Sequence, residues 1–277
     1  FSTVVLLGLL GCALWLDKPV GYAVLICLFC NLTSWEWFNM LREKKDEVCR
    51  PVILALSLIY PWVMGAVGST MVRDVPTFAM GVAILYILIL FFCGLFRMDY
   101  RGKSGAQMLS GMGLGLLAFF YPVWLFSFSL IFVRNTHMVN LLLLLILAAK
   151  MSDICAYVSG VLMGGKFFKR KFSPTISPKK TWEGIIGSFI ITSAATYGLL
   201  QCMPDVAELV TPGIFCIAMP ILFVLAVAGD LAGSLIKRGI GVKDSGSLLP
   251  GIGGIFDLID SPAFTVSALV ALIIFIA

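Results

Sequence analysis

The sequence predicts an all-α, polytopic integral membrane protein with about nine transmembrane helices and a cytoplasmic N-terminus. Of its 277 residues, 60% are hydrophobic and 13% are charged, whereas soluble domains average about 45–50% apolar and about 25% charged residues. Apolar windows of about 20 residues, long enough to cross the hydrocarbon core as a helix, recur along the chain. They lie at residues 1–16, 20–40, 52–72, 77–96, 109–133, 138–164, 185–203, 213–236 and 255–277.

The basic residues support this topology, because they alternate between the two sides of the membrane. The loops after the second, fourth, sixth and eighth windows hold 16 of the 20 Lys and Arg residues, and the other loops hold 3. The positive-inside rule therefore places the basic side in the cytoplasm, where it would meet anionic lipid headgroups. We expect an integral protein of a bacterial inner membrane, with its active site facing the cytoplasm.

The chain reads as one membrane domain, residues 1–277, with little readable chemistry in 1–140 and the catalytic helices and loops in 141–277. Its eight cysteines are scattered through apolar runs, so no disulfide framework is indicated. The first residue is Phe rather than Met, so we expect a trimmed start. In this first half, Glu36 lies among aromatic residues, which is typical of a solvated carboxylate at the membrane interface.

Residues 229–261 concentrate polar groups in an otherwise apolar chain. If the run ending near Ile236 is helical, Asp230, Ser234 and Lys237 share one face. A carboxylate at membrane depth usually faces a bundle interior or a cation. Asp257 and Asp260 would also share a helix face. Since Pro262–Ala277 alone would span only about 24 Å, the last helix should begin before Pro262.

Between these two helices, residues 243–246 form a polar loop and residues 250–254 a glycine-rich one that a ligand can approach closely. Oxygen donors beside basic side chains are what Mg²⁺ and a polyphosphate together require. This stretch therefore predicts a site for a divalent cation and a phosphorylated ligand.

The same stretch resembles the signature of the phosphatidate cytidylyltransferases (CDP-diacylglycerol synthases): Ser-x-x-Lys-Arg, Lys-Asp, Pro-Gly-His-Gly-Gly and Asp-Arg-x-Asp. In this sequence the matching residues are Ser234, Lys237-Arg238, Lys243-Asp244, Pro250-Gly251-Ile252-Gly253-Gly254 and Asp257-Leu258-Ile259-Asp260. Two positions depart from the pattern, because Ile252 replaces the family histidine and Leu258 the family arginine.

Two earlier segments carry further signals. Lys150, Asp153 and Tyr157 lie within one apolar window, where Lys150 and Asp153 either form a self-contained ion pair or Asp153 contributes to a cation or nucleotide site. The resembled family also has an Asp followed by Ala-Tyr here. Further on, residues 166–171 form a basic run, which is typical of a contact with anionic lipids.

The segment from Ser177 to Gly184 is a more specific motif. Ser177 and Pro178 are a good N-cap and first residue, so we predict that a helix begins there. Its positive end, with Lys179 and Lys180 in the first turn, would bind an anion. The alternative is a capped helix with solvated lysines. The run Ser-Pro-Lys-Lys-Thr-x-Glu-Gly resembles a second motif of the cytidylyltransferase family.

The resemblance implies transfer of a cytidylyl group from CTP to phosphatidic acid, with CDP-diacylglycerol and pyrophosphate as products. Its implied partners are CTP, phosphatidic acid, membrane lipids and a second copy of the chain as a homodimer, with no nucleic acid. Mg²⁺ or another divalent cation is the implied cofactor. The alternatives are a CTP-dependent lipid kinase, a cytidylyltransferase for another lipid phosphate and, from another class, a cation transporter.

Acidic residues are the candidates for catalysis and metal binding, and mainly basic and small residues are the candidates for substrate binding. The catalytic candidates are Asp230, Lys237, Asp244 and Asp257, and the metal candidates are Asp230, Asp244 and Asp257, with Asp153 and Asp260 as further ligands or groups behind them. The substrate-binding candidates are Ser177, Lys179, Lys180, Thr181, Ser234, Arg238, Lys243, Gly251, Gly253 and Gly254.

Overall fold

A computed structural model describes residues 18–41, 50–70, 75–101, 104–134, 136–168, 170–246 and 253–276 of the chain. The chain forms two compact units. Unit 1 comprises Phe1–Arg134 and Asp244–Phe256, and unit 2 comprises Asn135–Lys243 and Asp257–Ala277. The polar stretch 229–261 contributes to both units.

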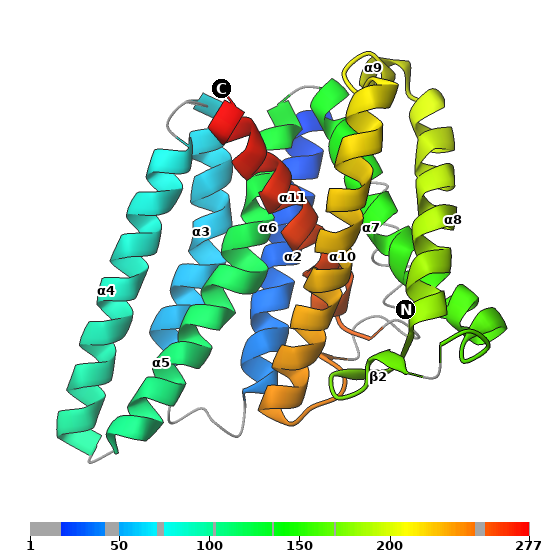
Figure 1. Ribbon diagram of the computed structural model, residues 1–277. Helices are drawn as coiled ribbons and strands as arrows, with labels where there is room; N and C mark the ends of the chain where they lie inside the picture. Colours follow the sequence, from blue (N-terminus) through cyan, green and yellow to red (C-terminus); the bar gives the residue numbers. More distant parts are fainter. Residues whose placement is uncertain are drawn as a thin grey trace. The chain divides into compact units, whose positions relative to one another are not determined.

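Unit 1 is built from antiparallel apolar helices (Figure 1). They are α2 (Lys18–Met40), α3 (Arg50–Thr70), α4 (Val75–Arg101) and α5 (Gly105–Phe119), followed by a π-helical turn, η3 (Phe120–Trp124), the short α6 (Leu125–Ser127) and a 3₁₀ segment, η4 (Phe128–Arg134). Ser104 caps α5, because its hydroxyl accepts the backbone N–H of Gln107, whose side chain accepts the Ser104 N–H in return.

The core of unit 1 is aromatic. The rings of Tyr86 and Phe119 stack with centroids 4.1 Å apart, and Tyr60 meets Phe119 edge-on at 5.1 Å. The hydroxyl of Tyr86 donates to the Gly115 carbonyl at 2.7 Å. A buried phenol needs such a partner, because an unpaired hydroxyl in an apolar interior is costly.

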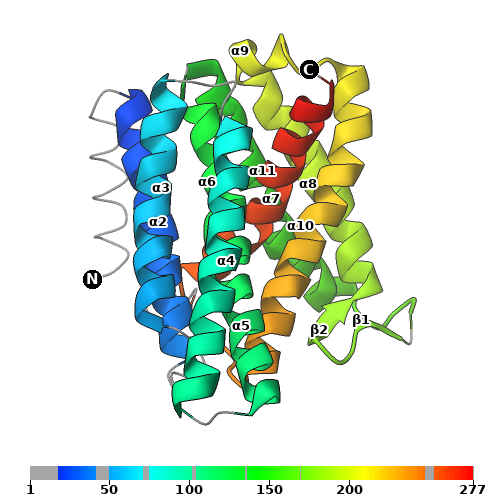
Figure 2. The same ribbon diagram turned by 90° about the vertical axis from the view of Figure 1, so that its left-hand side faces the viewer.

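Unit 2 contains α7 (Thr136–Met163), β1 (Lys171–Ser173), β2 (Ser177–Thr181), α8 (Trp182–Gln201), α9 (Pro204–Ala207), α10 (Pro212–Ile240) and all but the first residue of α11 (Phe256–Ile276). The two strands form an antiparallel hairpin in which Lys171 pairs with Thr181 and Ser173 with Ser177. Figure 2 shows this hairpin at the end where α8 begins.

The prediction that a helix begins at Ser177 and Pro178 is wrong. These residues lie in β2, and α8 begins at Trp182 with Thr181 as its N-cap. The Thr181 hydroxyl accepts the Gly184 N–H at 3.1 Å. The positive end of a helix dipole disfavours cations in the first turn and favours Glu183 there. The helix therefore starts after Lys179 and Lys180 rather than before them.

Glycine residues allow α7 and α8 to approach closely. A Cβ at Gly184 would lie 2.8 Å from the Ala156 carbonyl oxygen and 3.2 Å from the Cα of Gly160. Small residues at such crossings are typical of membrane helices, because they let two backbones touch. Ser188 of α8 also donates to the Ser152 carbonyl of α7 at 2.6 Å. This contact joins α8 to α7.

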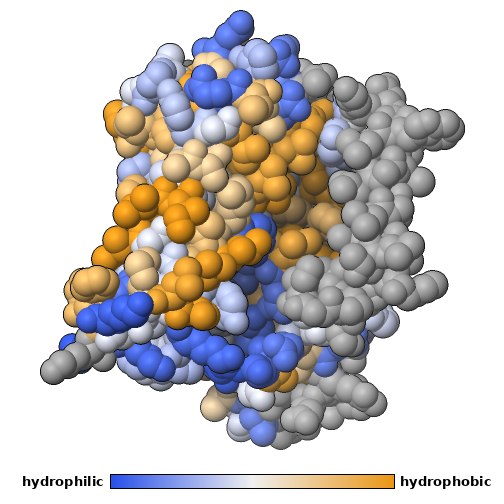
Figure 3. Space-filling model, turned by 90° about the vertical axis from the view of Figure 1, so that its right-hand side faces the viewer, coloured by the Kyte–Doolittle hydropathy of each residue, from blue (hydrophilic) through white to orange (hydrophobic). Residues whose placement is uncertain are grey.

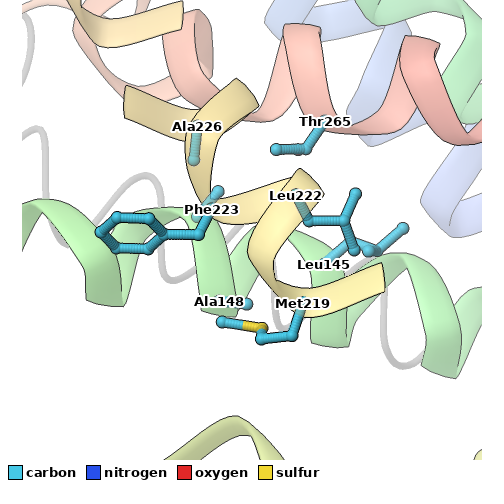
Figure 4. A pocket seen from close by; sticks show the side chains of 8 residues that line it. Leu145, Ala148, Met219, Leu222, Phe223, Ala226 and Thr265 are labelled. Atoms are coloured by element: carbon cyan, nitrogen blue, oxygen red, sulfur yellow. The ribbon is translucent and has the colours of Figure 1, made fainter. Parts of the chain in front are cut away.

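The helices α7, α10 and α11 pack around a small apolar pocket (Figure 4). Its lining comes from all three helices: Leu145, Ala148 and Ala149 from α7, Met219, Leu222, Phe223 and Ala226 from α10, and Thr265 from α11. Further along, a Cβ at Gly229 would lie 2.7 Å from the Asp260 carbonyl oxygen, so glycine lets α10 touch α11. These contacts bring together three helices that each carry an aspartate.

Among the described residues, six helical segments are long and apolar enough to cross a membrane, and Pro51–Val67 is a shorter apolar one. Hydrophobic side chains cover much of the middle of the face on which α8 lies, and hydrophilic ones gather toward its ends (Figure 3). The all-α, polytopic membrane architecture is thus confirmed. The count of nine and the orientation of the N-terminus stay predictions, and the window 1–16 lies outside the described residues. The last helix begins before Pro262, at Phe256, as predicted.

Candidate active site

Three aspartates from different helices of unit 2 converge on one point. Asp153 of α7, Asp230 of α10 and Asp260 of α11 each place a carboxylate oxygen within 4.8 Å of the other two. Asp260 is buried, whereas Asp153 and Asp230 are half-buried. Three like charges at this spacing repel one another strongly unless cations are held among them.

Lys150 supplies one of these cations. Its Nζ lies 3.2 Å from Asp153 Oδ2, 2.9 Å from Asp260 Oδ1 and 3.0 Å from the Asp257 carbonyl oxygen. The Ser261 hydroxyl donates to Asp153 Oδ2 at 3.2 Å, and the Ser261 N–H donates to Asp260 Oδ1 at 2.7 Å. Lys150 and Asp153 are therefore part of a network that joins α7 to α11, and the self-contained pair is excluded.

Two further ion pairs flank the three carboxylates. Lys180 of β2 pairs with Asp230, and Lys237 of α10 pairs with Asp257 of α11. The four aspartates Asp153, Asp230, Asp257 and Asp260 thus face the three lysines Lys150, Lys180 and Lys237, which leaves a formal charge of −1. Lys179, which lines the adjoining cavity, brings the formal charge to zero, so the site presents carboxylates and ammonium groups in equal number.

A cavity of about 420 Å³ adjoins the carboxylates. Asp153 and Asp230 line it on α7 and α10, and Ser177, Lys179 and Lys180 of β2 line it as well. Ligand pockets commonly enclose about 300–1,000 Å³. The hairpin therefore brings two ammonium groups to the wall of a cavity that also presents two carboxylates, an arrangement suited to a cation together with phosphate groups.

The three carboxylates fit a hard divalent cation. Mg²⁺ takes oxygen ligands at about 2.0–2.1 Å, so ligands on opposite sides of one ion lie about 4.2 Å apart, and Ca²⁺ at about 2.3–2.6 Å allows a wider set. The observed spacing of up to 4.8 Å is close to these values. Asp153, Asp230 and Asp260 are therefore the residues that could hold such an ion.

The structure brings together some of the predicted site residues. Asp230, Ser234 and Lys237 lie on one helix, α10, and Asp257 and Asp260 lie on α11. The three carboxylates that converge include Asp230 but not Asp257, because the Asp257 side chain pairs with Lys237. Asp153 and Asp260, which spacing suggested only as further ligands, are the neighbours of Asp230.

Other predicted residues have local structural partners. Thr181 caps α8, and Arg238 is exposed and donates from Nη1 to the Val242 carbonyl at 3.2 Å, where α10 ends. Lys243 is exposed in the turn after α10, and Asp244 is exposed in unit 1. Gly253 has a φ of 110°, which favours glycine. Gly254 is buried, and Gly251 lies outside the described residues.

Sequence reasoning missed Glu36. Its side chain is buried, with 2% of the residue exposed, so the prediction of a solvated carboxylate at the interface is wrong. Its oxygens accept the backbone N–H groups of Ile255 and Phe256 at 3.0 and 2.9 Å. Because these donors follow Glu36 by more than two hundred residues, no local pattern could have indicated them. A charged residue inside an apolar run was the available signal.

Known proteins are similar to this chain over most of its length. A family model described as "Cytidylyltransferase family" matches residues 1–276. A phosphatidate cytidylyltransferase of Haemophilus influenzae is 30% identical over 273 residues, covering 94% of this chain and 92% of its own. One of Mycobacterium bovis is 31% identical over 263 residues (92% and 80%). One of Thermotoga maritima is 30% identical over 249 residues (88% and 86%).

Proposed function

The chain belongs to the cytidylyltransferase family, and on this premise we propose that it is a CTP:phosphatidate cytidylyltransferase. It transfers CMP from CTP to phosphatidic acid and releases pyrophosphate, and its product is CDP-diacylglycerol. One observation best supports a site for this reaction. Asp153, Asp230 and Asp260 converge beside a cavity that the lysines of β2 also line.

The reaction needs little covalent chemistry from the protein. A phosphate oxygen of phosphatidic acid attacks the α-phosphorus of CTP, a new P–O bond forms, and the bond from the α-phosphorus to the bridging oxygen breaks. The electron pair leaves with pyrophosphate. Because the lipid phosphate is already an anion, no base is required to activate it. The protein has to hold two anions together in line and neutralise their charge.

The residues of unit 2 are suited to these two tasks. Lys179 and Lys180 line the cavity and would bind the phosphates of CTP. Lys237 is held by Asp257, and its ammonium would neutralise a further phosphate oxygen. Asp153, Asp230 and Asp260 would hold a divalent cation, which when bound neutralises charge on the leaving pyrophosphate. Asp244 stays a predicted catalytic residue and metal ligand. Ser177, Ser234, Arg238, Lys243 and the signature glycines stay predicted contacts of the substrates.

The orientation and assembly are proposals of the same kind. The excess of Lys and Arg on one side supports a cytoplasmic face for the site, where CTP is found, in a bacterial inner membrane. A homodimer is the expected assembly from the family resemblance. The acyl chains of the lipid would lie among apolar helix faces at that leaflet.

The test is an assay of the purified protein in detergent with labelled CTP, phosphatidic acid and Mg²⁺. We expect label in the lipid, equimolar pyrophosphate and loss of both on chelation of the metal. Asp230→Asn should lower turnover by about 100-fold or more. Asp205→Asn is the matched control, because Asp205 is exposed in α9 and pairs with His137. Formation of CDP instead of pyrophosphate would identify a lipid kinase. Cation flux without CTP would identify a transporter.

A further inference from the structure

Glu36 of α2 holds both ends of the loop 244–256 within unit 1. Its Oε1 accepts the Ile255 N–H at 3.0 Å, and its Oε2 accepts the Phe256 N–H at 2.9 Å. At the other end of the loop, the buried Ser245 hydroxyl donates to Oε2 at 3.5 Å. One buried carboxylate therefore contacts residues that lie ten positions apart in the loop.

Two glycines of the loop lie so close to this carboxylate that no side chain would fit at their positions. A Cβ at Gly246 would lie 2.8 Å from Glu36 Oε1, and a Cβ at Gly254 would lie 2.4 Å from Glu36 Oε2 and 2.1 Å from the Ser245 hydroxyl oxygen. Real Cβ atoms do not approach that closely, so any larger residue would displace the carboxylate. Glycine at position 254 therefore leaves free the space that the Glu36 carboxylate occupies.

The carboxylate also meets Phe256, the first residue of α11. Phe256 is the first residue of that helix, so its N–H is one of the donors that a helix leaves unsatisfied. The positive end of the helix dipole stabilises a negative charge at this place. The Phe256 ring packs against Trp37 and Tyr121, each with centroids 5.5 Å away. Glu36 and its neighbour Trp37 thus fix both the backbone and the ring of Phe256.

We propose that Glu36 is a positioning residue for the transfer reaction, acting through the signature loop. It fixes where α11 begins, and Asp257 follows Phe256 directly and Asp260 follows it by four residues. It also fixes the loop that follows Lys243 and carries Asp244. This inference rests on the proposed function for its catalytic part, whereas the anchoring of the loop can be tested without turnover.

The test compares Glu36→Gln with Thr33→Val. Both side chains are buried on α2, but Thr33 donates only within its own helix, to the Phe29 carbonyl at 2.7 Å. The amide of Gln keeps one acceptor oxygen and turns an NH₂ toward the other donors. We expect trypsin to cut after the exposed Lys243 about ten-fold faster in Glu36→Gln, because the loop opens more often. Thr33→Val should be cut at the wild-type rate.

Kinetics then separates positioning from stability. For Glu36→Gln we expect kcat for CMP transfer to fall about 10- to 100-fold. We expect the KM for phosphatidic acid to stay within about two-fold, since the change misaligns reacting groups rather than removing a lipid contact. A variant that loses thermal stability but keeps the wild-type kcat in its folded fraction would show a purely structural role and overturn the proposal.

A second variant covers the case in which Glu36→Gln does not fold. Gly246→Ala should push the carboxylate aside and reproduce faster cleavage and lower kcat, whereas Gly81→Ala, whose Cβ would meet nothing within 4 Å, should do neither. Wild-type cleavage and kcat in Gly246→Ala would overturn the proposal. If the wild-type protein forms no CDP-diacylglycerol, the proposed function fails, and the cleavage rates still decide whether Glu36 anchors the loop.

Discussion

Replacing Lys150 by Met should destabilise the protein strongly, because it leaves two carboxylates without their cation. Lys150 bonds to Asp153, Asp260 and the Asp257 carbonyl, and the Asp260 side chain is only 3% exposed. Removing one partner of a buried ion pair costs about 3–5 kcal/mol. Since the Lys150 side chain is 21% exposed, we expect the free energy of unfolding to fall by the lower end of this range, about 3 kcal/mol.

Thermal unfolding in detergent measures this loss. At about 2–4 °C per kcal/mol for a chain of this size, the Tm of Lys150→Met should fall by about 6–12 °C. Lys166→Met is the control, because Lys166 is exposed beyond the end of α7. Lys150→Met/Asp260→Asn should recover at least half of the loss, since the uncompensated charge is removed. A Tm for Lys150→Met equal to that of the control, or a double variant as unstable as the single one, would refute this account of the site.

Three other substitutions test separate contacts. Gly184→Ala should lower stability by about 1–3 kcal/mol, because its Cβ meets the Ala156 carbonyl at 2.8 Å, whereas Gly198→Ala on the same helix meets nothing within 4 Å and should not lower the Tm. Thr181→Ala should cost about 1 kcal/mol through loss of the α8 cap, and Thr181→Ser should retain it; equal Tm values for the two would argue against the cap. Asp257→Asn should lower CMP transfer by about 100-fold while the protein still inserts, because Lys237 loses its counter-charge; near-normal turnover would remove Asp257 from the site.

The helices were predictable because the bilayer imposes a length on them. Eight of the nine apolar windows overlap described helical segments, and six of those segments are long and apolar enough to cross a membrane. The faces of α10 and α11 were predictable from local spacing, because it places Asp230 on the same helix face as Lys237, and Asp257 on the same face as Asp260.

Local reasoning failed where tertiary contacts decide. Spacing could not tell that Asp230 would meet Asp153 and Asp260 rather than Asp257, because that choice depends on how α7, α10 and α11 pack. The start of α8 was misplaced because Ser177 and Pro178 favour an N-cap locally, whereas pairing with β1 extends the chain through Thr181. The partners of Glu36 depend on contacts between distant segments.

The division of the signature stretch between the two units has a consequence for how the chain can be cut. Residues 244–256 belong with the first 134 residues, although 109 residues of unit 2 separate them in the sequence. A fragment ending at Arg134 would keep Glu36 inside an apolar bundle and lack the amides and hydroxyl that solvate it. Because a buried carboxylate without hydrogen-bond donors is costly, we expect such a fragment to be less stable than the same helices with residues 244–256 present. Split or chimeric versions of this protein should therefore carry the late loop along with the early helices.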